Sequence, residues 1–163
     1  MAIINKGDCV GIVYWNGNKW IVHDGVLVSP KTIKSGRNTK KTMVTIRHYN
    51  DPKKKPENLH STPYLILKTS AELHETAINC AAIKNPSIKA GKCVAVTFKT
   101  NSNTDIKNGV LLCDINSPNT AGTVWINHWK FPSGFNTSQS KPPKKMVEES
   151  KKYTSAKVKE VKI

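Results

Sequence analysis

Short apolar runs separated by polar turns predict that the chain folds as a succession of β-strands. Three of these runs, CVGIVYW, KWIVH and GVLVSP, follow one another before Lys31. The turns between them contain Asn16-Gly17 and Asp24-Gly25, and such dipeptides favour hairpins because both residues tolerate positive φ. We therefore expect the chain to begin with a β-meander.

The same pattern continues towards the C-terminus. Val44, Ile46 and His48 alternate with Met43, Thr45 and Arg47, as expected of a strand with one buried face. Residues 71–82 have helical propensity, but we assign residues 76–83 to a strand because strand-like segments follow. Further strands are expected over residues 64–68, 92–100, 108–115 and 122–129. Many short strands with little helix predict an all-β barrel or sandwich.

A weak internal repeat suggests two similar β-units. GDCV at residues 7–10 is followed by DGVL at 24–27, and GKCV at 91–94 is followed by NGVL at 108–111. Both pairs are separated by 17 residues, from Gly7 to Asp24 and from Gly91 to Asn108. We therefore expect a β-barrel domain over residues 1–135, made of two small barrels at about 1–70 and 71–135.

Beyond Phe135 the sequence becomes rich in Ser, Pro, Lys and Glu, with eight lysines and three glutamates over residues 136–163. So few apolar side chains cannot offset the entropy of ordering, which predicts a disordered tail. Such a lysine-rich tail could order on a protein partner, or it could simply keep the chain soluble.

The four cysteines, Cys9, Cys80, Cys93 and Cys113, are widely spaced, and each lies in or beside an apolar run. This favours buried free thiols, and therefore a reducing, cytoplasmic compartment, with a disulfide framework as the alternative. The first nine residues also lack the apolar segment of a secretory signal. We expect no metal, no cofactor and no membrane span, because no matching motif and no apolar run of roughly 20 residues is present.

Positive charge dominates the composition, since 26 Lys and Arg against 11 Asp and Glu give a net charge of +15. Between residues 31 and 55 the only acid is Asp51. The nine basic residues there are Lys31, Lys34, Arg37, Lys40, Lys41, Arg47, Lys53, Lys54 and Lys55. Such a segment predicts contact with nucleic acid, most simply RNA, or with another polyanion. A solvated surface that only aids solubility is the alternative.

Three segments, taken in order, resemble the chymotrypsin-like protease family. GVLVSPKTIKSGRN at residues 25–38 is similar to the segment that precedes the family's catalytic histidine. HETAINCAAIKNPSIKAGKCVAV at residues 74–96 looks like the segment in which an acid opens a strand that leads to the second barrel. SPNTAGTVWIN at residues 117–127 looks like the nucleophile loop. The resemblance implies a double β-barrel of compact, viral type, located in the host cytoplasm if the chain is viral.

Matched residue by residue, the family's base falls on Asn38, its acid on Glu75 and its nucleophile on Ala121. Asparagine cannot accept a proton at neutral pH, and alanine offers no nucleophile. Thr123 and Val124 replace the family's Gly and Pro, which also departs from its oxyanion turn. The resemblance therefore implies a degenerate triad that cannot carry out acyl transfer.

Other interpretations remain open at this point. Ala121 could replace a Ser or Cys in a serine or cysteine endopeptidase, although this would not account for Asn38. Another register could make His23 or His48 the base and Cys113 the nucleophile, but strand histidines more often have structural roles. A viral coat or other structural protein with a basic arm is a third reading. We favour a catalytically inactive, chymotrypsin-like module that binds RNA or another polyanion through its basic segment.

Overall fold

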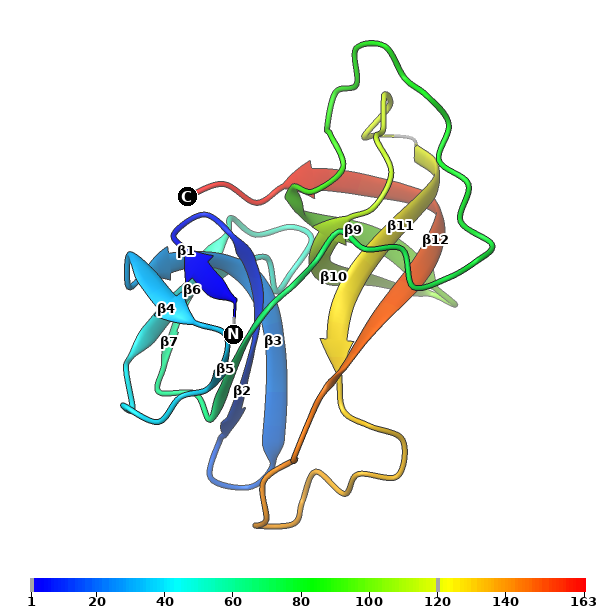
Figure 1. Ribbon diagram of the computed structural model, residues 1–163. Helices are drawn as coiled ribbons and strands as arrows, with labels where there is room; N and C mark the ends of the chain where they lie inside the picture. The colour runs from blue at the N-terminus through cyan, green and yellow to red at the C-terminus, as the bar shows by residue number, and fades with distance from the viewer. Residues whose placement is uncertain (1, 120) are drawn as a thin grey trace.

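The computed structural model describes residues 2–119 and 121–163, and every regular element in this part of the chain is a β-strand (Figure 1). The expected all-β class is therefore confirmed. The strands are β1 (Ile3–Asn5), β2 (Cys9–Trp15), β3 (Trp20–Ser29), β4 (Thr32–Lys34), β5 (Gly36–Arg37), β6 (Val44–His48), β7 (Glu57–Ser61), β8 (Leu65–Lys68), β9 (Cys93–Thr100), β10 (Asn103–Leu111), β11 (Ala121–Lys130) and β12 (Val147–Glu160).

The strands form two units that pack against each other, the first coloured blue to cyan and the second green to red in Figure 1. The first unit is a six-stranded antiparallel sheet in the order β5-β8-β2-β3-β6-β7, accompanied by the small β1-β4 ribbon. In the second unit, β9 pairs with β10, β10 with β11, β11 with β12, and β12 again with β9. This ring of pairs closes a four-stranded barrel.

The expected three-stranded meander is wrong, because Asp24-Gly25 is not a turn and the second and third apolar runs form one strand, β3. Both residues lie within β3, where Gly25 pairs with Val10 of β2. A Cβ at Gly25 would lie 2.6 Å from the carbonyl oxygen of Arg47 on β6, so the close approach of two strands requires glycine there. The dipeptide therefore marks tight strand packing, whereas Asn16 does form a turn by accepting bonds from the Asn18 and Lys19 amides.

The internal repeat has a structural counterpart. Cys9 pairs with Val26 in the β2-β3 hairpin, and Cys93 pairs with Val110 in the β9-β10 hairpin, 84 residues later. In each unit a third strand follows, and Arg47 of β6 pairs with Val26 as Asn127 of β11 pairs with Val110. The equivalence extends to the sequences IRHY at residues 46–49 and INHW at 126–129. β2-β3-β6-β7 and β9-β10-β11-β12 thus follow the same strand order, although β12 closes on β9 whereas β7 is the edge of an open sheet.

Two further expectations about secondary structure are wrong. Residues 76–83 form no strand and belong to a long connection between the units, and of these eight residues only Ile78 is buried. The segment expected to be a disordered tail contains β12, which pairs with both β11 and β9. Tyr153, Ala156 and Val158 of β12 are buried in the barrel core, and this burial offsets the cost of ordering the strand.

The cysteines are also not free, since Cys9 is bonded to Cys93 and Cys80 to Cys113. Cys9 and Cys93 occupy matching positions on the faces through which the two units meet. Because 84 residues separate them, the sequence gives no local sign that they form a disulfide. The expected free thiols were the main ground for a reducing compartment, and that ground is removed.

Candidate functional site

Asn38, at the position of the family's base, has a structural role in the first unit. Its side-chain Nδ2 donates to the carbonyl oxygens of Thr42 and Pro63, both at 2.9 Å. Its Oδ1 accepts a bond from the Thr42 amide at 3.0 Å. These three bonds hold the loop between β5 and β6, and an imidazole has too few polar atoms to make all of them.

The other two triad-equivalent positions lie in different surroundings. Glu75 is exposed in the connection between the units, and its backbone carbonyl accepts a bond from Ile78. Ala121 is buried in the core of the four-stranded barrel of the second unit, where it pairs with Ala156 of β12. Among the described residues, no hydrogen bond joins the side chains of Asn38 and Glu75, and the Ala121 methyl group can form none.

The alternative nucleophile fails on covalent grounds. Cys113 is bonded to Cys80, so it offers no thiolate to either candidate base. His23 and His48 do lie together, with ring centroids 5.1 Å apart, at the junction between the two units. Sequence spacing did not predict this pairing, which follows from the adjacency of β3 and β6 in the sheet.

Part of the basic segment lines a pocket of about 550 Å³ beside the β1-β4 ribbon. Lys34, Arg37 and Lys40 are exposed and supply its cationic groups. The remaining lining residues are Ile3, Pro30, Thr32, Ile33, Asn38, Thr39 and Thr42. The guanidinium of Arg37 lies 5.1 Å from the centre of the Tyr64 ring, a cation–π contact that favours one orientation of its donors.

The other predicted basic residues are not part of this pocket. Lys31 and Lys41 are exposed beside the lining segments, and Lys53, Lys54 and Lys55 are exposed in the β6-β7 connection. Arg47 is half-buried, and its guanidinium donates to Asn58 Oδ1 and to the carbonyl oxygen of Lys162. The structure therefore groups three of the nine residues around one cavity and gives Arg47 a contact with the C-terminal segment.

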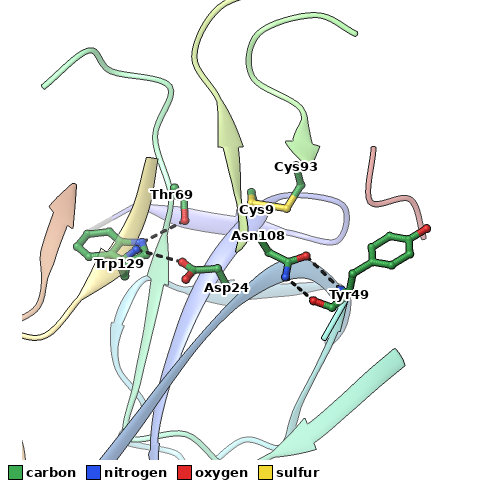
Figure 2. Close-up of a disulfide and its surroundings, with 7 residues drawn as sticks. All are labelled: Cys9, Asp24, Tyr49, Thr69, Cys93, Asn108 and Trp129. Atoms are coloured by element: carbon green, nitrogen blue, oxygen red, sulfur yellow. Dashed lines mark hydrogen bonds between the residues drawn. A yellow bond between two sulfur atoms is a disulfide. The ribbon is translucent and has the colours of Figure 1, made fainter. Parts of the chain in front are cut away.

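Two matching contacts join the units on either side of the Cys9–Cys93 disulfide (Figure 2). Asp24 of β3 accepts a bond at 3.1 Å from the backbone amide of Trp129, which lies in β11 of the second unit. Asn108 of β10, the equivalent of Asp24, accepts a bond at 3.1 Å from the backbone amide of Tyr49 and donates to the Tyr49 carbonyl at 2.7 Å. In each unit, the side chain at this position of the hairpin, Asp24 or Asn108, therefore holds the backbone of the equivalent aromatic residue of the other unit, Trp129 or Tyr49.

Burial at this junction shifts the titration of its ionisable groups. Desolvation raises the pKa of Asp24 to about 7, and Lys107, with its Nζ 3.8 Å from Asp24 Oδ2, partly opposes the rise. Desolvation also lowers the pKa of His23 to about 4, assisted by the charges of His48 and Lys107. The same cause lowers the pKa of His128 to about 4, although its partner Glu149 acts in the opposite direction.

A second polar cluster fastens the connection between the units to the four-stranded barrel. Glu148 of β12 accepts bonds from the hydroxyl and amide of Ser70, and its Oε1 contacts the ring of His74. Asn127 Nδ2 donates to the carbonyl oxygens of Ser70 and Glu72. The carboxylate stands between serine and histidine, so the order differs from that of a catalytic triad, in which the base contacts the nucleophile.

Comparison of the chain with models of known protein families found no match, and comparisons with curated proteins and with solved structures found no significant similarity. The resemblance to chymotrypsin-like proteases therefore rests on the three sequence segments alone. Among the described residues, no group of three or more Cys, His, Asp or Glu side chains is placed to hold a metal ion. The same part of the chain has no helix long and apolar enough to cross a membrane.

Proposed function

We propose that the chain is a binding module for RNA, or for another polyanion, built on a degenerate chymotrypsin-like pair of β-units. The observation that carries the proposal is the pocket of about 550 Å³ that Lys34, Arg37 and Lys40 line within a segment of nine basic residues and one acid. Phosphate groups neutralised at such a surface release counterions, which supplies a favourable free energy of binding.

The composition of the pocket favours RNA over a polymer that carries charge alone. Ile3, Pro30 and Ile33 supply apolar surface beside the cationic groups. An unstacked base can rest on apolar side chains while its phosphate contacts lysine or arginine, as in other single-strand binders. Arg37 presents planar donors that suit a phosphate, and its contact with Tyr64 restricts their orientation.

The architecture and the triad-equivalent positions support the inactive form of the fold. Two units with the same strand order in a single chain are what a double β-barrel of this family would contain. The side-chain amide of Asn38 is hydrogen-bonded to the surrounding loop, and Ala121 contributes only a buried methyl group. Neither residue can therefore take part in acyl transfer. The two disulfides favour maturation in an oxidising compartment over the cytoplasm.

The test is binding of a single-stranded RNA oligonucleotide, measured by fluorescence anisotropy across a range of salt concentrations. We expect the triple variant K34Q/R37Q/K40Q to bind at least tenfold more weakly and to show a shallower dependence on salt. The matched control, K99Q/K144Q/K145Q, removes the same charge from exposed lysines outside the pocket and should bind nearly as well as the parent. Salt-independent binding, or equal losses in both variants, would contradict a role for the pocket.

A polyanion without bases separates the two ligand classes. If inorganic polyphosphate of matched charge binds as tightly as the RNA, the ligand is recognised by charge alone. If the RNA binds more tightly and only the RNA is sensitive to Ile33→Ser, the apolar surface contacts a base.

A further inference from the structure

A second pocket, of about 220 Å³, opens at the junction of the two units, away from the residues of the basic pocket. β3 and β10 contribute equivalent segments, so His23 and Lys107 occupy matching positions on its wall. The complete lining is Val22, His23, Asp24, His48, Tyr49, Asn50, Ile106, Lys107 and Asn108. Its volume is below the roughly 300–1,000 Å³ typical of drug-sized ligands, which limits an occupant to a small molecule or ion.

The polar groups of this pocket contain more available donors than acceptors. Lys107 carries three N–H donors, and its one ionic contact with the residues that the structure describes is Asp24 Oδ2 at 3.8 Å. His23 and His48 make no side-chain hydrogen bond within the described part of the chain, although His48 is only 5% exposed. The amide of Asn108 is occupied by the Tyr49 backbone and the Nδ2 of Asn50 by Glu57. The free donors therefore belong to one lysine and two imidazoles.

The charges around the pocket favour an anion over a cation. Lys107 from β10 would repel a metal ion, whereas the two imidazoles can each donate a proton to an oxygen ligand. The acids that act on these groups are Asp24 of β3, Glu57 of β7 and Glu148 of β12. Glu57 bonds Asn50 and Glu148 bonds Ser70, and Asp24 is the one carboxyl among the residues that line the pocket.

We propose that this junction pocket binds a small tetrahedral oxyanion of the phosphate type, through the Lys107 ammonium and the His23 and His48 imidazoles. This proposal does not depend on the RNA-binding pocket, because the two pockets share no lining residue. The oxyanion bridges β3 and β6 of the first unit and β10 of the second, so its binding also links the two units.

Binding of the anion is coupled to uptake of protons. The empty pocket keeps His23 and His48 neutral, because desolvation lowers the pKa of both rings. A bound oxyanion stabilises the imidazolium form and the protonated form of Asp24, so all three groups gain protons on binding. Affinity therefore increases as the pH falls, by up to about tenfold per pH unit for each proton taken up.

The test is a titration of the full chain, with its disulfides intact, with inorganic phosphate as the probe. Binding is monitored by NMR of the imidazole protons at pH 6 and at pH 8. We expect saturable shifts of the His23 and His48 signals, with at least tenfold tighter binding at pH 6. The variant Lys107→Gln should weaken binding at least tenfold, and Lys99→Gln, an exposed lysine on β9, should not.

If Lys107→Gln fails to fold, His23→Asn removes one imidazole and should produce the same loss. Shifts that do not saturate, or equal affinity in all the variants, would overturn the site. A second titration, with uridine 5′-monophosphate, distinguishes the source of the phosphate group. If this nucleotide binds more tightly than inorganic phosphate, the pocket recognises the phosphate of a nucleotide, and if it binds more weakly, the pocket recognises the free phosphate ion. The variant K34Q/R37Q/K40Q should bind phosphate in this pocket normally, so failure of the RNA-binding proposal leaves this result unaffected.

Discussion

Gly11 lets the two units approach each other closely. It lies on β2, where a Cβ would collide with the indole of Trp129 from the second unit. The indole Nε1 donates to Thr69 Oγ1 at 3.1 Å, and the backbone amide of Trp129 donates to Asp24 (Figure 2). The equivalent of Gly11 is Ala95, so the repeat differs at the position where the larger aromatic residue packs.

Gly11→Ala should therefore destabilise the fold, because the new methyl group would force Trp129 away from its hydrogen bonds. We expect a loss of about 1–3 kcal/mol in the free energy of unfolding, measured by urea denaturation. Gly122→Ala is the matched control, because a Cβ there meets no atom of the described residues within 4 Å. Equal stability of the two variants would show that Trp129 does not pack as tightly as the structure indicates.

Among the elements, β12 accounts for the largest difference between expectation and structure. Its buried positions change from odd at Tyr153 to even at Ala156 and Val158. Between them Ser155 has a φ of 53°, close to where the strand changes partner from β11 to β9. This break in the alternation, together with the lysines on the outer face, hides the strand from a search for period-two patterns.

Limited digestion with trypsin tests whether β12 is a strand in solution. Lys151, Lys152 and Lys157 lie within paired β12, whereas Lys144 and Lys145 precede it in an exposed segment without strand pairing. We expect cleavage after Lys144 or Lys145 to be at least tenfold faster than cleavage within β12, because a paired strand must open first. Early release of short peptides from residues 151–163 would contradict the paired strand and support the prediction of a disordered tail.

At the scale of the whole molecule, the junction between the units is held by a disulfide and by buried ionisable groups. The Cys9–Cys93 bond crosses it, with Asp24 and Asn108 on either side (Figure 2). The units therefore depend on one another for hydrogen bonds, and we expect them to unfold together.

The pH dependence of unfolding tests the titration of this junction. His23 and His128 have a pKa of about 4 in the folded chain, below the unfolded value of 6.5, so their contribution to stability rises between pH 4 and 6.5. Asp24 acts in the opposite direction, because its pKa of about 7 is raised and its contribution is lost as the pH rises from 4 to 7. Two imidazoles outweigh one carboxyl, so the urea midpoint should rise with pH.

Asp24→Asn should make that rise steeper, because it removes the opposing group while keeping an acceptor for Trp129. Asp105→Asn, at an exposed position on β10, should leave the slope of the parent unchanged. An Asp24→Asn slope equal to that of the parent would mean that Asp24 is ionised in the folded chain throughout this range.

Local sequence patterns are enough to predict the all-β class, the β2-β3 hairpin and the two repeated units. These depend on local alternation, on turn residues such as Asn16-Gly17, and on a spacing that recurs. The sequence also identified the basic segment, because charge is a property of composition. The likeness to a protease family stays a prediction, and the residues at its catalytic positions are Asn38, Glu75 and Ala121.

Contacts between residues far apart in the sequence could not be predicted from these patterns, and they come from the three-dimensional fold. The fold paired Cys9 with Cys93, selected three of the nine basic residues for one pocket, and brought His23, His48 and Lys107 together at the junction. It also ordered β12, whose few apolar side chains are buried only because β9 and β11 lie on either side. Local patterns specify strands, but burial and charge at a site depend on which strands become neighbours, and that depends on packing across the whole chain.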